Sequence, residues 1–79
     1  KMKRPLADKV EQALISNKIL NPEDCRMLEV TYDKETEELH VNRRLGWSSA
    51  ILRNLLKVTD KFFLVFTIKD QHTIIIYRS

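Results

Sequence analysis

Residues 61–78, with the sequence KFFLVFTIKDQHTIIIYR, decide the fold of this chain. Side chains alternate with the period of two that a β-strand has, and both alternating sets are largely apolar. One face of the first half carries Phe62, Leu64, Phe66 and Ile68, and the other carries Phe63, Val65 and Thr67. The second half places Ile74 and Ile76 opposite Thr73, Ile75 and Tyr77. We predict a β-hairpin that turns near Asp70-Gln71 and is covered on both faces, by two helices or by a helix and a second subunit.

An amphipathic helix is predicted immediately before this hairpin, over residues 47–58. Its apolar stripe consists of Trp47, Ile51, Leu55 and Val58, widened by Leu52 and Leu56. Ser48 or Ser49 is expected to cap its start. We expect the Trp47 ring to be mostly buried against the sheet, with its indole N–H bonded to an acceptor.

A second hairpin is predicted over residues 27–44, where apolar and polar side chains alternate on both sides of the segment Asp33–Glu37. Asp33 and Thr36 can bond the nearby backbone in a tight turn. Glu37 is the costly position of this turn, because glycine would fit a left-handed conformation better.

The N-terminal part of the chain is predicted to be helical over residues 5–18. Pro5 suits a first-turn position, and Leu6, Val10, Ala13 and Leu14 share one face. A further helical turn is predicted over residues 21–26, because Asn21-Pro22 resembles an N-cap followed by a first-turn proline.

The resulting order is helix, hairpin, helix, hairpin, which predicts an α+β fold with one small sheet and two helices (αββαββ). By element order alone the chain resembles a β-grasp fold with an added N-terminal helix. It also resembles a winged helix, because the helix over residues 47–58 leads directly into a hairpin. No motif supports either resemblance, and the helix that usually precedes a recognition helix is replaced by an acidic hairpin.

The length of 79 residues predicts a single domain over residues 1–79, with residues 1–4 as a flexible basic tail. Cys25 is the only cysteine, so no internal disulfide can form, and we expect a reducing, intracellular location in the cytoplasm or nucleus. No apolar run approaches the roughly 18–20 residues that a membrane helix needs. The chain begins at Lys1 rather than at methionine, which is compatible with its being a fragment of a longer protein.

Charge is distributed unevenly along the chain. Residues 5–38 contain four basic and nine acidic side chains, whereas residues 39–79 contain seven basic and two acidic ones. Such asymmetry indicates either a polyanionic partner for the basic half or two halves that neutralise each other in the folded protein.

Catalytic and metal-binding patterns are not evident. His40 and His72 are the only histidines, and no histidine–cysteine spacing typical of a zinc site occurs. The single glycine, Gly46, excludes a glycine-rich phosphate loop. We therefore expect a protein without enzymatic activity, metal or cofactor. A minor alternative is a ribonuclease that uses His72, Tyr77 and Arg78.

The leading functional hypothesis is a regulatory nucleic-acid-binding module, most simply a DNA-binding one. Arginine forks match phosphate geometry, and helix N-termini favour anions. The predicted contacts are Asn42, Arg43, Arg44, Ser48, Ser49, Arg53 and Lys57. The competing interpretation is that Trp47 fills the core while Arg43 and Arg44 keep an edge strand in solution.

The alternative hypothesis is a protein–protein interaction or self-association module that uses the apolar hairpin over residues 62–77. A hairpin with two apolar faces invites another chain, including a second copy, wherever a face or a strand edge stays uncovered.

Overall fold

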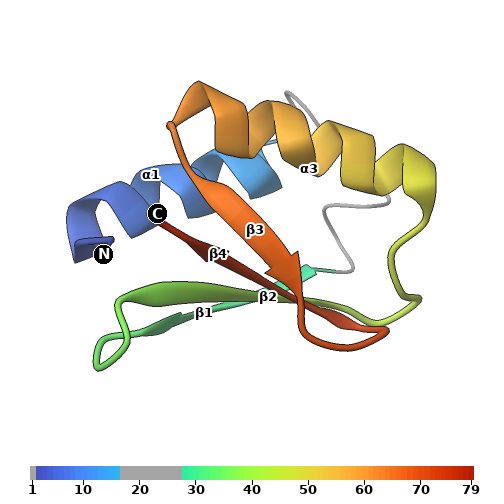
Figure 1. The fold of residues 1–79 in the computed structure, drawn as a ribbon, viewed down its shortest axis with the longest axis horizontal. Helices are drawn as coiled ribbons and strands as arrows, with labels where there is room; N and C mark the ends of the chain where they lie inside the picture. The colour runs from blue at the N-terminus through green and yellow to red at the C-terminus, as the bar shows by residue number, and fades with distance from the viewer. Residues whose placement is uncertain (1, 17–27) are drawn as a thin grey trace.

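The computed structural model describes residues 2–16 and 28–79. In this part of the chain two α-helices and four β-strands follow the predicted order (Figure 1). The elements are α1 (Arg4–Ile15), β1 (Leu28–Asp33), β2 (Glu38–Arg43), α3 (Ser49–Lys61), β3 (Val65–Ile68) and β4 (Thr73–Tyr77). The expectation of a small α+β fold is confirmed. The helical turn predicted over residues 21–26, residues 17–18 of the first predicted helix and Cys25 lie outside the described residues.

The four strands form one sheet in the order β1-β2-β4-β3, and every neighbouring pair is antiparallel. The two hairpins therefore meet through β2 and β4, where Val41 lies opposite Ile74. This arrangement leaves β1 at one edge of the sheet and β3 at the other. Element order alone does not distinguish a β-grasp-like from a winged-helix-like arrangement, so neither of these two resemblances is confirmed.

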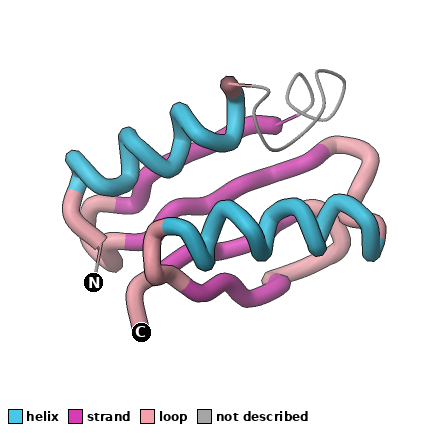
Figure 2. The backbone as a smooth tube through the Cα atoms, turned by 90° about the horizontal axis from the view of Figure 1, so that it is seen from above, coloured by secondary structure: helices cyan, strands magenta, loops and turns pink. Residues whose placement is uncertain are grey.

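Both helices lie on the same face of the sheet, as the two perpendicular views show (Figures 1 and 2). Helix α1 contacts β1, α3 contacts β3, and the helices contact each other. Of the two covers predicted for the last hairpin, the one in which two helices take opposite faces is therefore wrong, and the one with a helix and a second subunit stays a prediction. Because two helices side by side already span four strands, no described segment is left for the opposite face.

The core lies between the helices and the sheet. It is built from fully buried side chains of α1, α3 and the two central strands. These are Val10, Leu14, Leu39, Val41, Leu55, Val58, Ile74 and Ile76. The apolar stripes predicted for both helices thus face one shared layer, as amphipathic helices require.

The turn between β1 and β2 follows the predicted chemistry. The Asp33 carboxylate accepts hydrogen bonds from the backbone N–H groups of Glu35 (3.0 Å) and Thr36 (3.2 Å). These two bonds, that of Thr36 first, lower the pKa of Asp33 below its usual 3.8. Glu37 adopts the left-handed conformation, with φ of 57°, at the position where the sequence predicted a cost.

Residues 2–4 do not form the flexible tail predicted for residues 1–4, since Met2 is anchored and α1 begins at Arg4. Met2 is fully buried, its N–H donates to the Glu37 carbonyl (3.1 Å), and its carbonyl accepts from the Tyr32 hydroxyl (2.7 Å). Apolar Met2 is drawn into the core between α1 and the first hairpin, because burying its side chain removes a large apolar surface from water.

Candidate functional site

The start of α3 is organised mainly by hydrogen bonds within the protein. The Ser48 hydroxyl accepts from the Ile51 N–H (3.3 Å) and so caps the helix, as predicted. Arg43 is only 8% exposed, and its guanidinium donates to the Gly46 carbonyl. Its place on β2 explains this burial. Every second residue of a strand points to the same face, so Arg43 lies with Leu39 and Val41 on the helix-covered face. A solvent-facing, phosphate-binding role for Arg43 does not agree with this position.

The other predicted nucleic-acid contacts are divided among separate surfaces. Asn42 faces the uncovered side of the sheet, where its amide donates to the Thr73 hydroxyl (3.1 Å). Arg44 is exposed on the loop after β2, and Ser49 is exposed in the first turn of α3. Arg53 and Lys57 are both exposed on α3 and lie one turn apart. Of the predicted contacts, the structure thus places Ser49, Arg53 and Lys57, which are all exposed and four residues apart, along one ridge of α3.

Trp47 fixes the loop before α3 to the far hairpin. Its indole N–H donates to the His72 carbonyl (3.0 Å), which confirms the expected acceptor. The ring is partly buried and packs against the core. The Arg43 N–H donates to the same His72 carbonyl (2.8 Å), so one backbone oxygen joins β2 and the loop before α3 to the turn that precedes β4.

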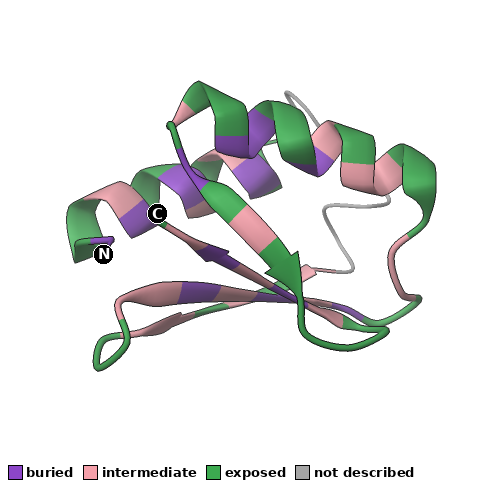
Figure 3. Cartoon of the chain, viewed as in Figure 1, coloured by how far each residue is buried: buried purple, intermediate pink, exposed green. Residues whose placement is uncertain are grey.

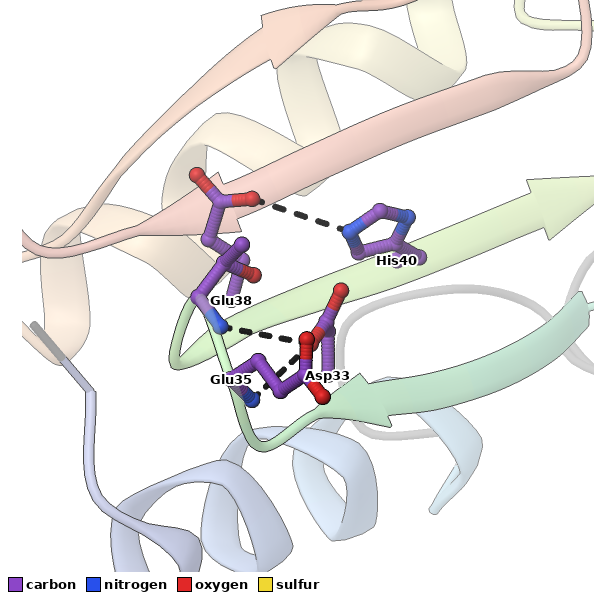
Figure 4. A network of polar contacts seen from close by, with 5 residues as sticks. Asp33, Glu35, Glu38 and His40 are labelled. Carbon is purple, nitrogen blue, oxygen red and sulfur yellow. Dashed lines mark hydrogen bonds and ion pairs between the residues drawn. The ribbon is translucent and has the colours of Figure 1, made fainter.

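The uncovered face of the sheet carries charges of both signs near β1 and β2, with Lys34 and Lys69 beside three acidic side chains. A shallow hollow of about 560 Å³ opens there over Glu29, Thr31, Asp33, His40, Asn42 and Thr73, with loop residues at its rim. His40 Nε2 lies 3.7 Å from a Glu38 carboxylate oxygen (Figure 4). The Asp33 carboxylate accepts a hydrogen bond from the Glu35 N–H of its own turn. Among the described residues no three metal-ligating side chains come together. Without such a cluster the hollow offers no defined ligand set.

The edge strand β3 is the least covered part of the sheet (Figure 3). Val65 is 38% exposed and Ile68 is 58% exposed, although Ile68 belongs to the side of the sheet that carries the helices. No charged residue occurs from Phe62 to Ile68. Natural edge strands usually carry charges, prolines or bulges that prevent pairing with another chain. An uncharged and exposed edge is therefore a candidate docking surface, which we call the β3 edge (residues 63–68).

Backbone groups of β3 point alternately toward β4 and away from it. The Lys69 N–H donates to the Thr73 carbonyl (2.9 Å), which fixes the phase of the ladder. In an antiparallel pair, alternate residues exchange both of their hydrogen bonds with the partner strand. Val65 and Thr67 are consequently the residues bonded to β4, whereas the N–H and C=O groups of Phe66 and Ile68 point outward.

Phe63 joins α3 to the β3 edge in a conformation that usually belongs to glycine. Its φ is 58°, its N–H donates to the Asp60 carbonyl (3.1 Å), and the Leu64 N–H donates to the Thr59 carbonyl (2.8 Å). These two bonds form a Schellman motif, whose left-handed residue is most often glycine. The Phe63 ring is 87% exposed. Phe63 thus adopts a strained backbone conformation although its ring has little contact with the rest of the protein.

The sequence prediction named the apolar hairpin but did not identify Phe63, Val65 and Ile68 as a site. The available signal was a run of seven uncharged residues, 62–68, that begins directly after a helix and contains no glycine. Alternation alone does not say which strand lies at the edge, so these side chains looked like core residues.

Comparisons with protein-family models, with curated proteins and with solved structures find no match to this chain. Over residues 2–16 and 28–79, neither helix is long and apolar enough to cross a membrane.

Proposed function

We propose that this protein is a non-enzymatic protein-interaction module that docks an extended segment of another chain along the β3 edge. The observation that carries the proposal is the exposed, uncharged edge strand, whose outward backbone groups at Phe66 and Ile68 can accept a further strand. Strand addition obtains affinity from main-chain hydrogen bonds and specificity from alternate side chains.

The opposite edge of the sheet supports this choice by contrast. Strand β1 carries Glu29 and Asp33, and its Tyr32 side chain is engaged by the Met2 carbonyl and by the Arg4 guanidinium, 5.3 Å from the ring centre. Charged side chains discourage pairing at an edge. Of the two edges, β3 alone combines exposed apolar side chains with an uncharged sequence.

Phe63 provides the anchor of the proposed surface. A left-handed conformation costs a non-glycine residue roughly 1–2 kcal/mol. Strain of this kind is concentrated at functional sites. An exposed aromatic ring is also the type of side chain that dominates binding energies at protein interfaces. We infer that Phe63 stabilises the complex more than the isolated fold.

Replacing Phe63 with glycine should separate these two roles. We expect the free energy of unfolding to be unchanged or to rise by up to about 1 kcal/mol, because relief of the left-handed strain offsets the larger entropy of unfolded glycine. Binding of an extended peptide with the sequence LVFTIK should weaken at least tenfold. Thermal unfolding and an NMR titration of dilute labelled protein measure the two effects.

A matched control is Ile15→Ala, which shortens an exposed apolar side chain at the end of α1, above the other half of the sheet. This variant should bind the peptide as the parent protein does. The proposal fails if millimolar peptide leaves the Phe66 and Ile68 amide signals unchanged, or if Phe63→Gly binds as tightly as the control.

Nucleic-acid binding remains a second candidate, which we propose on the exposed ridge formed by Arg53 and Lys57. Within the described residues, neither side chain forms an ion pair. Helix α3 lies on the face of the sheet opposite the one that carries Glu29 and Asp33 (Figure 1). Two cations one turn apart can each contact a backbone phosphate. Such contacts would position the protein on a nucleic acid without specifying its sequence.

Duplex DNA and single-stranded RNA titrations test this second candidate. Two phosphate contacts predict an affinity that falls about tenfold between 50 and 200 mM salt. The double variant Arg53→Gln/Lys57→Gln should abolish this salt dependence, while Lys9→Gln/Lys34→Gln, which removes two exposed lysines elsewhere, should retain it. The candidate is rejected if neither nucleic acid binds at 50 mM salt.

A further inference from the structure

We propose that the partner at the β3 edge is a second copy of this chain, paired antiparallel through β3 so that two four-stranded sheets become one of eight strands. This inference rests on the proposed function and names its partner. A two-fold axis perpendicular to the sheet generates such a dimer, in which each copy presents the same surface to the other.

The burial of side chains along the edge strand indicates a self-complementary surface. On the side that carries the helices, Leu64 is 4% exposed, Phe66 is partly buried, and Ile68 is 58% exposed. The cover that α3 provides thus decreases from the beginning of the strand to its end. An antiparallel copy reverses this gradient, so the well-covered beginning of one strand lies beside the uncovered end of the other.

The phase of the backbone selects the register. The outward groups belong to Phe66 and Ile68, and pairing Phe66 of one copy with Ile68 of the other uses all of them in hydrogen bonds. This register places Thr67 on the two-fold axis. In this register, the two residues of each pair lie on the same face of the joined sheet, as antiparallel pairing requires.

Side chains agree with this register on both faces. Beneath the helices, the exposed Ile68 meets the Phe66 ring, so two partly covered apolar groups leave water together. On the other face, Thr67 meets its own copy, and Lys69 lies opposite Val65. The lysine stem can cover Val65 while its ammonium group stays in water.

Sedimentation equilibrium of the full chain tests the inference. We expect the apparent mass to approach twice the 9.4 kDa of one chain as the concentration rises from micromolar to millimolar. Ile68→Pro should remain monomeric, because proline removes an outward N–H without removing a bond to β4. Ile68→Lys, which adds a charge at an exposed position, should give the same result. The control Ile15→Lys should dimerise as the parent chain does.

The outcomes separate this inference from the proposed function. A protein that stays monomeric at millimolar concentration but binds the LVFTIK peptide overturns the second copy and leaves strand docking intact. Dimerisation that survives both Ile68 variants, with their native folds verified by circular dichroism, overturns pairing through β3. In the dimer, isotope-filtered NMR should show contacts between Phe66 of one copy and Ile68 of the other, and contacts in a different register would refute the Thr67-centred arrangement.

Discussion

Trp47→Ala should lower the free energy of unfolding by about 3 kcal/mol, a large share of the roughly 5–15 kcal/mol that holds such a domain together. The ring is partly buried against the core, and its N–H is bonded to the His72 carbonyl. Truncation therefore removes apolar contacts and one of the bonds that join the loop before α3 to β4. Chemical denaturation monitored by circular dichroism measures the effect.

Trp47→Phe is the appropriate comparison for this variant. It retains most of the apolar contact and removes only the indole N–H, so it should cost about 1 kcal/mol. A Trp47→Ala protein that unfolds within a degree or two of the parent would show that Trp47 is not part of the scaffold. It would then be a binding residue rather than a core residue.

Arg43→Ala should destabilise the fold by about 2–3 kcal/mol. The guanidinium is buried on the helix-covered face and donates to the Gly46 carbonyl. Its removal leaves a carbonyl without this donor and empties space that the aliphatic stem fills. Gly46 adopts the left-handed conformation with φ of 82°, so the loop that leads into α3 loses a hydrogen bond at this residue.

The neighbouring residue supplies a direct control. Arg44 carries the same charge but is exposed, and Arg44→Ala should change stability by less than about 0.5 kcal/mol. Equal melting temperatures for the two alanine variants would contradict the structural role of Arg43 and restore it as a surface contact.

Local features of this fold could be predicted because local chemistry determines them. The Ser48 cap, the Asp33 turn and the strained Glu37 each depend on residues that are close in sequence. Asp70 supports the second hairpin in a related way, since its carboxylate accepts from the His72 and Thr73 N–H groups. The His72 bond, as the larger influence, and the Thr73 bond lower the pKa of Asp70.

The global arrangement could not be predicted in the same way. Alternation identifies two faces of a strand, but it does not reveal that β4 is central and β3 lies at the edge. Arg43 and Arg44 are adjacent in sequence and look equivalent there. Arg43 is the last residue of β2 and lies on the helix-covered face, whereas Arg44 lies on the exposed loop that follows.

Amide hydrogen exchange along β3 tests the central claim most directly. In dilute protein, the Val65 and Thr67 amides should exchange slowly because they bond β4, while those of Phe66 and Ile68 should exchange rapidly because they point outward. At millimolar concentration the Phe66 and Ile68 amides should become protected in the parent chain, and the Phe66 amide should stay unprotected in Ile68→Pro. If Phe66 and Ile68 exchange equally fast at both concentrations and with added LVFTIK peptide, the β3 edge does not accept a strand and the account is wrong.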